Sequence, residues 1–299
     1  MFGQKRIVLA AVVIVLAVCS PAGSSEKVLS MSTTTSTLAS GLLDILLPAF
    51  KAETGIDVKV IAKGTGAAIR DGMDGNVDII FVHAKGREEQ FVAEGYGTKR
   101  YPVMHNDFVI VGAKEDPAGV AKTKDVYEAL RAIADSGAEF ISRGDDSGTH
   151  TKEQSLWKAS GVELVNNTNE VIKKGKKVTV AFQEPANAAN WYRSIGQGMG
   201  KTLTYADEKG AYALTDRGTY IKYKYGKTPP IELEIVSEGA EALVNPYGII
   251  PLNPKKFAHV KYDYAKQFAE WLTSEPGQKL IAEYRLIGKQ LFYPDAMAN

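Results

Sequence analysis

The sequence contains little that would support thiol chemistry, a membrane span or binding to nucleic acid. It has one cysteine in 299 residues, Cys19, so a mature domain that starts after it has neither a disulfide nor a reactive thiol. The apolar run over residues 7–18 is shorter than the roughly 20 residues that a transmembrane helix needs. Acidic and basic residues nearly balance, at 35 and 36, which gives no reason to expect nucleic acid or an acidic membrane as a partner.

The amino-terminal segment has the layout of a secretory signal peptide. Lys5 and Arg6 precede the apolar run, and small residues follow it, with Ala22 at the expected cleavage position. Residues 1–22 are therefore predicted to be removed, which leaves a near-neutral, cysteine-free protein in the periplasm. One alternative stays open, because residues 16–19, LAVC, are close to a lipoprotein box that would anchor the chain through Cys19.

Residues 142–150, SRGDDSGTH, carry the clearest chemical signal in the chain. A short apolar stretch precedes them, and a helical pattern that opens near Ser147 or Gly148 follows, so they form a strand-to-helix turn. Backbone N–H groups at a helix amino terminus attract anions, and the hydroxyls of Ser147 and Thr149 add donors. Arg143 offers a forked guanidinium that can hold two oxygens of one anion. The turn is predicted to be a cradle for a small oxyanion.

Two other interpretations of this turn stay open. Ser147 can be only a helix N-cap while Arg143 pairs with Asp145 or Asp146, which would give the turn a purely structural role. Ser147 and His150 can also be assigned to an exported serine hydrolase. However, the residues around Ser147 do not form a G-x-S-x-G elbow, and the closeness of His150 in sequence does not indicate a triad. We therefore expect a binding protein without catalytic residues, not an enzyme.

A run of hydroxyl residues at positions 32–37 forms a second predicted strand-to-helix turn. A strand over residues 27–31 precedes it, and apolar residues follow at helical spacing from Leu38 to Phe50. Thr35 or Ser36 is the expected N-cap of that single helix. The apolar strand before and the periodic helix after the run favour a folded turn over a low-complexity linker.

Two further strands, over residues 56–61 and 77–82, are each followed by a turn and a helix. This alternation indicates βαβ units in a parallel sheet, whose ligands bind at the carboxyl ends of the strands. Thr65 lies in the first turn, where the glycines match neither a dinucleotide-binding motif nor a P-loop. His83 lies in the second turn, and a structural hydrogen-bonding role is favoured for it.

A strand at residues 106–112 is predicted to carry the chain into a second lobe, in which strands and helices alternate again. The lysine-rich residues 173–177 are expected to be a solvated loop, because no aromatic residues are interleaved with the lysines. The remaining expected elements are a helix over 123–134, a helix closed by 191–193, a glycine-rich loop at 196–200, a surface strand at 220–225, a return strand at 245–251, and helices over 262–272 and 276–284.

Motifs along nearly the whole mature chain carry a family resemblance. They are TTTST at 33–37, VDIIFVHA at 77–84, NDFVIVG at 106–112, SRGDDSGTH at 142–150, GQGMG at 196–200, LTDRGT at 214–219 and NPYG at 245–248. In combination they resemble the tungstate-binding component of bacterial ABC transporters. That resemblance implies a type II periplasmic binding protein: an α/β protein of two lobes, each a mostly parallel sheet flanked by helices, with two hinge strands and a dehydrated oxyanion between the lobes.

The resemblance also implies boundaries, partners and a site. Lobe 1 is expected over residues 26–108 and 243–299, and lobe 2 over 109–242, with hinges near 106–112 and 236–247. The implied ligand is tungstate, or molybdate, and the implied partner is the transporter permease. A monomer is expected, with no cofactor and no metal apart from the tungsten of the oxyanion. The expected ligand-binding residues are Thr34, Thr35, Ser36, Thr65, Arg143, Ser147, Gly148 and Thr149.

A phosphate receptor of an ABC transporter is the alternative, because Arg143, Asp145 and the Ser147-Gly148-Thr149 sequence also resemble the phosphate-binding signature. In that family the acidic residue accepts a hydrogen bond from the protonated ligand. Tungstate carries no proton at neutral pH, so an Asp145 carboxylate that faced it would repel it. The tungstate interpretation therefore requires Asp145 to turn away, onto Arg143 or a backbone N–H group.

Overall fold

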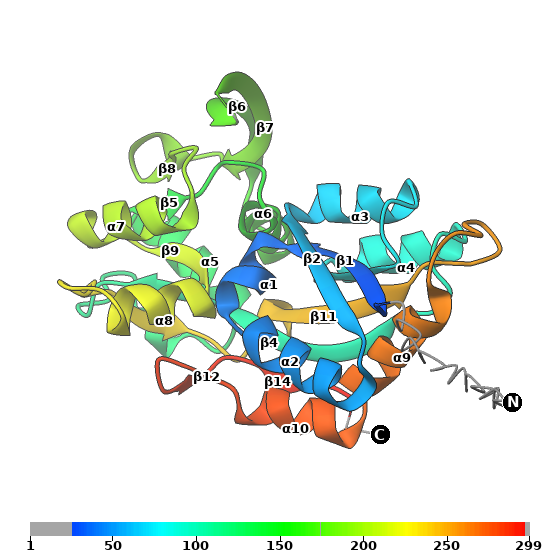
Figure 1. Ribbon diagram of the computed structural model, residues 1–299. Helices are drawn as coiled ribbons and strands as arrows, with labels where there is room; N and C mark the ends of the chain where they lie inside the picture. Colours follow the sequence, from blue (N-terminus) through cyan, green and yellow to red (C-terminus); the bar gives the residue numbers. More distant parts are fainter. Residues whose placement is uncertain (1–25, 174, 297–299) are drawn as a thin grey trace, which may run out of the picture.

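The computed structural model describes residues 26–173 and 175–296, so the predicted signal peptide and Cys19 lie outside the described residues. Two α/β lobes are arranged around strand β4 (Tyr101–Gly112). In Figure 1 the first lobe is coloured blue, cyan, orange and red, and the second lobe is coloured green and yellow. Within the described residues, no helix combines the length and the apolar character that a membrane crossing requires.

The first lobe contains a mixed sheet. Its elements are β1 (Val28–Thr34), α1 (Thr35–Ser40), α2 (Leu43–Thr54), β2 (Asp57–Lys63), α3 (Thr65–Met73), β3 (Ile79–Val82), α4 (Lys85–Ala93), β11 (Val244–Pro251), α9 (Tyr262–Leu272), α10 (Glu275–Glu283) and the short strands β12 (Arg285–Leu286), β13 (Lys289–Gln290) and β14 (Tyr293–Pro294). Strands β1, β2 and β3 are parallel, as predicted, and β11 is antiparallel to β3.

Both faces of this sheet are buried, because successive strand residues point to opposite sides. In β3, Ile79 and Phe81 pack with Phe50 and Phe268 in the core formed with α2 and α9. The alternate residues, including Ile80, belong to a second core formed with α3 and α4. Because both faces are covered, the predicted oxyanion donors of this lobe lie not on a face of the sheet but in the turns that follow its strands.

Strand β4 links the two lobes by changing its partners. Asp107 lies opposite Val244 of β11, whereas the next residue, Phe108, lies opposite Asp216 of β9 (Ala213–Asp216). The last residues of β4 also pair with β10 (Glu234–Ser237). The predicted strand at 106–112 is thus confirmed as the longer β4, and the sheet order β10-β4-β11-β3-β1-β2 runs through it.

The second lobe carries two cores, one on each face of β4 and β9. Phe108 packs with Trp157 and Tyr212 on one side, and Val109 packs with Leu203 on the other. The other elements are α5 (Val126–Ser136), β5 (Phe140–Ser142), α6 (Gly148–Ser160), β6 (Leu164–Lys173), β7 (Lys176–Pro185), β8 (Tyr192–Ser194), α7 (Met199–Lys209), α8 (Arg217–Tyr225) and three single-turn 3-10 helices, η1 (Val120–Lys122), η2 (Ala188–Asn190) and η3 (Glu241–Leu243).

The prediction of a helix closed by residues 191–193 is wrong. Tyr192–Ser194 forms β8, which pairs in parallel with β5. The rings of Trp191 and Tyr192 pack with those of Phe140 and Trp157 in the core. This tertiary packing overrides the helical spacing of the local sequence.

The surface strand predicted at 220–225 is also wrong, since these residues lie in α8. The Asp216 carboxylate accepts the backbone N–H of Thr219 at 2.8 Å and caps the helix. Tyr220 and Tyr223 are three residues apart and therefore share the helix face that packs on the second-lobe core around Leu203. The alternation of Tyr and Lys suggested a strand, but the buried residues of this segment follow helical spacing.

Two other predictions differ in extent. The helix expected from Leu38 to Phe50 is two helices, because Gly41 ends α1 in the left-handed conformation with φ 86°. The lysine-rich segment is not a loop throughout: Lys173 ends β6 and Lys176 begins β7. The two strands form a long antiparallel hairpin that stands out from the second lobe (Figure 1).

Candidate oxyanion site

Hydroxyl side chains gather in the hydroxyl turn, residues 34–37, where β1 ends and α1 begins. Thr34 is the N-cap of α1, in an extended conformation with φ −89° and ψ 153°. Its Oγ1 accepts the backbone N–H of Thr37 at 3.1 Å and lies 3.0 Å from Ser36 Oγ. The predicted cap at Thr35 or Ser36 is therefore wrong. Both of these residues are instead exposed in the first helical turn.

His83, directly after β3, connects the hydroxyl turn with the two strands that meet at the crossing. Its Nε2 lies 3.2 Å from both Thr34 Oγ1 and Ser36 Oγ. Its Nδ1 lies 3.2 Å from Asn245 Oδ1, and Asn245 Nδ2 donates to Asn106 Oδ1 at 2.7 Å. Burial lowers the pKa of the His83 imidazole, so the neutral ring is favoured in this structure.

The signature turn, residues 142–150, has the predicted strand-to-helix form. Ser147 is the N-cap of α6, and its Oγ accepts the backbone N–H of His150 at 3.3 Å. Gly144 has φ 60°, and a side chain there would overlap Ser194 Oγ. A side chain at this position would therefore be strained, which favours glycine.

Asp145 is turned into the signature turn. Its Oδ2 accepts Nε of Arg143 at 2.9 Å, and its Oδ1 accepts the backbone N–H of Ser147 at 3.2 Å. The tungstate interpretation required this orientation. Part of the structural interpretation is correct as well, because Ser147 caps the helix and Arg143 pairs with Asp145. Among the described residues, however, the two terminal amino groups of Arg143 make no hydrogen bond, and they stay available to a ligand.

A buried carboxylate that the sequence did not reveal lies behind this turn. Glu153, on α6, is 2% exposed and accepts Ser142 Oγ at 2.8 Å and the Tyr192 hydroxyl at 2.7 Å. Burial raises its pKa to about 7. Because the acid is then neutral more readily in the folded than in the unfolded chain, its contribution to stability falls as pH rises from about 4.5 to 7.

Thr65 begins α3, and the next residue, Gly66, lies beside a basic side chain that was not predicted to belong to the site. Gly64 is the N-cap of α3, and the guanidinium of Arg87 lies against Gly66, 3.3 Å from where a Cβ would be. Lys63, which ends β2, is paired with Asp71 at 2.7 Å. Lys63 and Arg87 are therefore two basic groups at the carboxyl end of the parallel strands.

The structure assembles the predicted site residues in separate groups. The hydroxyl turn is one group, the signature turn is another, and no hydrogen bond among the described residues joins Arg143 or Thr65 to the hydroxyl turn. Asp216 lies near enough to His83 to raise the pKa of the imidazole against the effect of burial. Because Asp216 caps α8 in the second lobe, the two lobes meet close to the hydroxyl turn. In the described part of the chain, no group of three or more His, Cys, Asp or Glu side chains could hold a metal ion.

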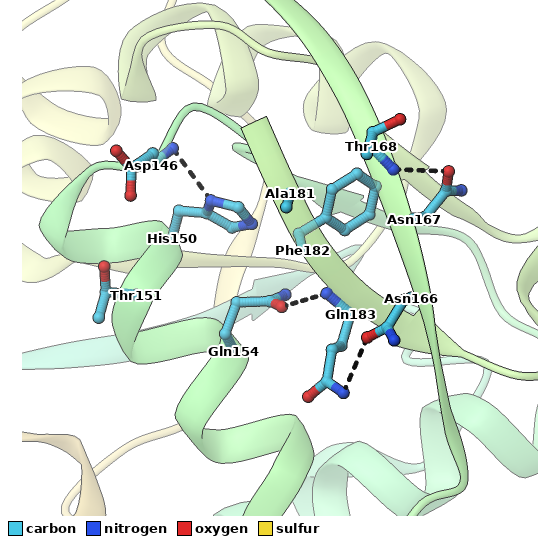
Figure 2. Close-up of a pocket in the computed structure, with 10 residues that line it drawn as sticks. All are labelled: Asp146, His150, Thr151, Gln154, Asn166, Asn167, Thr168, Ala181, Phe182 and Gln183. Atoms are coloured by element: carbon cyan, nitrogen blue, oxygen red, sulfur yellow. Dashed lines mark hydrogen bonds between the residues drawn. The ribbon is translucent and has the colours of Figure 1, made fainter. Parts of the chain in front are cut away.

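A hollow of about 620 Å³ lies between α6 and the β6–β7 hairpin. Figure 2 shows Asp146 and His150 from the signature turn at one edge, with the backbone N–H of Asp146 donating to His150 Nδ1 at 3.0 Å. The Gln154 side chain accepts the Gln183 backbone N–H at 2.6 Å across the hollow. None of the predicted oxyanion ligands lines this hollow, so it is distinct from the candidate site.

Comparison with known proteins identifies the family to which this geometry belongs. The PBP superfamily domain matches residues 20–276. The tungstate-binding protein TupA of Peptoclostridium acidaminophilum is 42% identical over 286 residues, which cover 93% of this chain and 91% of that protein. The chain belongs to the tungstate-binding protein family. Members of this family are solute-binding proteins without enzymatic activity, so the serine hydrolase interpretation is excluded.

Solved structures in the tungstate-binding family agree with this assignment. The tungstate-binding protein TupA of Desulfovibrio alaskensis G20 is 44% identical with a TM-score of 0.80, covering 90% of this chain and 98% of its own. The tungstate ABC transporter structure from Geobacter sulfurreducens is 49% identical with a TM-score of 0.68, covering 87% and 100%. The two-lobed type II periplasmic binding protein fold is thereby confirmed, although the sheets are mixed and not mostly parallel as predicted, because β4 is antiparallel to β9, β10 and β11.

Proposed function

We propose that this protein captures tungstate outside the cytoplasm and delivers it to the permease of an ABC transporter. Membership of the tungstate-binding family supports the choice of ligand. One observation carries the chemistry: both Asp145 oxygens accept hydrogen bonds within the signature turn, from Arg143 and from Ser147. Because the Asp145 carboxylate is paired within the turn, the groups that face a ligand are hydrogen-bond donors. An unprotonated dianion such as tungstate has no hydrogen to donate and needs only such donors.

One guanidinium and a set of neutral donors form the proposed ligand shell. Arg143 supplies the main charged contact through its terminal amino groups, since its Nε is held by Asp145. Thr34 and Thr149 are only 2% and 6% exposed, so a ligand that reaches them has left bulk water. The proposed donors, by hydroxyl or backbone N–H, are Thr34, Thr35, Ser36 and Thr65 from the first lobe and Ser147, Gly148 and Thr149 from the second.

Tungstate and molybdate are expected to raise the melting temperature far more than sulfate or phosphate. A ligand at 100 times its dissociation constant adds about 2.7 kcal/mol to the free energy of unfolding. A thermal-shift series with the four sodium salts at one concentration makes the comparison. The largest shift with phosphate, following the protonation of that ion, would identify a phosphate receptor instead. Tungstate and molybdate share charge and shape, so the preference for tungstate rests on the family.

We also propose the division of the chain into lobes. Lobe 1 comprises residues 26–108 and 243–299, lobe 2 comprises 109–242, and the hinges lie near 106–112 and 236–247. The change of partners between Asp107 and Phe108 supports the first boundary. The mature protein, after cleavage of residues 1–22, works in the periplasm as a monomer, and lipid anchoring at Cys19 is the less favoured alternative.

Saturating tungstate is expected to reduce the radius of gyration in small-angle scattering. The hydroxyl turn lies before the crossing in β4 and the signature turn after it, so an anion that contacts both stabilises the closed arrangement of the lobes. The same measurement gives the mass and so tests the monomer. An unchanged scattering profile at saturation would place the ligand within one lobe, or would mean that the empty protein is already closed.

A further inference from the structure

The hydrogen bonds of Asn245 determine which nitrogen of neutral His83 carries its proton. Asn245 donates from Nδ2 to Asn106, so its amide oxygen faces His83 Nδ1 at 3.2 Å. A carbonyl oxygen only accepts, and therefore the proton lies on Nδ1. The neutral ring then presents Nε2 as an acceptor for a hydroxyl hydrogen of Thr34 or Ser36, whose oxygens both lie 3.2 Å away.

A bound oxyanion competes for the same hydroxyl hydrogens. Each hydroxyl group has one hydrogen, so a Thr34 or Ser36 hydroxyl that donates to His83 cannot donate to the ligand. Thr34 Oγ1 already accepts the Thr37 backbone N–H. With neutral His83, the anion therefore loses a donor or Nε2 loses its partner. A protonated ring removes the conflict, because Nε2–H donates to the hydroxyl oxygen and the hydroxyl hydrogen turns to the anion.

We propose that His83 takes up one proton at Nε2 when the oxyanion binds, and that this reverses its hydrogen bond with the Thr34 or Ser36 hydroxyl. The proton comes from solvent, and the imidazolium places a positive charge behind the hydroxyl turn. The inference rests on the proposed function, since it concerns the same anion site. It makes His83 a positioning residue that acts on the ligand through the hydroxyls.

The groups around His83 are compatible with this change of charge. Asp216, capping α8 from the second lobe, raises the pKa of the ring, and the amide oxygen of Asn245 accepts from Nδ1–H in both charge states. Tyr247 of β11 lies with its ring centroid 4.7 Å from that of His83, and burial raises its own pKa, so it stays neutral. In the free protein, burial lowers the pKa of His83 more than Asp216 and Asn245 raise it. A dianion beside the hydroxyl turn would raise this pKa and favour the imidazolium.

The expected pH dependence has a defined sign. Between the lowered pKa of free His83 and its raised pKa in the complex, binding takes up a proton, so affinity falls as pH rises. A full proton corresponds to about a tenfold loss of affinity per pH unit. Below the window the ring is protonated in both states, and above it in neither, so the affinity levels off on both sides.

Isothermal titration of the mature protein with sodium tungstate, from pH 6 to 8.5 in buffers of different ionisation enthalpy, counts the protons taken up. We expect uptake approaching one per anion in the wild type and none in His83→Gln, with a flat pH profile in the variant. His259→Gln is the matched control, since His259 contacts the Gly75 carbonyl and the Phe257 ring and lies outside the site, and it should keep the wild-type uptake. Glu153→Gln should keep it as well.

The possible failures are distinguishable. If wild-type protein does not bind tungstate, the proposed function is wrong. If it binds without proton uptake, or if uptake persists in His83→Gln and disappears in Glu153→Gln, the role of His83 is wrong while the function stands. Histidine-selective NMR of the unmodified protein needs no substitution: one ring should change from the Nδ1–H tautomer to imidazolium on addition of tungstate at pH 7.5. No such change would also overturn the inference.

Discussion

Arg143→Ala is expected to weaken tungstate binding by about 2–5 kcal/mol, which is roughly 30-fold to several thousandfold in the dissociation constant. The guanidinium is the charged donor of the signature turn, and its terminal amino groups make no hydrogen bond among the described residues. Arg143→Lys should also bind weakly, because a single ammonium cannot reproduce two parallel hydrogen bonds. Isothermal titration with sodium tungstate measures both variants.

Arg131→Ala is the matched control for this prediction. Arg131 also belongs to the second lobe, but it donates Nη1 to the Ser160 carbonyl at 2.8 Å and lies outside the signature turn. It should bind tungstate like the wild type. If Arg143→Ala does so too, the guanidinium serves only to hold Asp145, and the structural interpretation of the turn is the correct one.

The two turns of the site are predictable from sequence because each depends on neighbouring residues. Ser147 lies between a short apolar strand and a helical repeat, and the structure makes it the N-cap of α6. The same local reasoning placed the hydroxyl turn but chose the wrong cap. Thr34 is still in the β1 ladder while its side chain caps α1, and a residue with both roles is not marked by spacing alone.

The network behind the site is not predictable, because its members are distant in sequence. His83 contacts Thr34 and Asn245, which are 49 and 162 residues away, and nothing near His83 indicates either partner. Glu153 has the sequence context of an ordinary acidic residue on a helix, and its contact with Tyr192, 39 residues away, depends on the fold. The failure of the predicted helix at 191–193 has the same origin, since packing around Trp157 determines that segment.

Arg217→Ala is expected to lower the free energy of unfolding by about 3 kcal/mol, near the lower end of the range for one partner of a buried ion pair. Arg217, the first residue of α8, donates Nε and Nη2 to the two oxygens of Asp107, both at 2.6 Å. It also donates to Glu238 at 2.6 Å. The side chains of Arg217 and Asp107 are only 18% and 14% exposed, so removal of the guanidinium leaves a poorly solvated carboxylate at the last β4 residue that pairs with β11.

Urea unfolding of the ligand-free protein measures this effect, with Arg193→Ala as the control. Arg193 also pairs with a carboxylate in the second lobe, that of Glu139, but its side chain is 51% exposed, and such pairs contribute about 0–1 kcal/mol. Asp107→Ala combined with Arg217→Ala should cost less than the sum of the two single changes, because the double variant removes both members of the buried pair and leaves only the half-exposed Glu238 carboxylate without its partner. Arg217 joins Asp107, in the first hinge segment (106–112), to Glu238, in the second (236–247), so loss of the bridge should also loosen the crossing between the lobes. If Arg217→Ala unfolds at the same urea concentration as Arg193→Ala, the crossing is held by the β4 ladder alone.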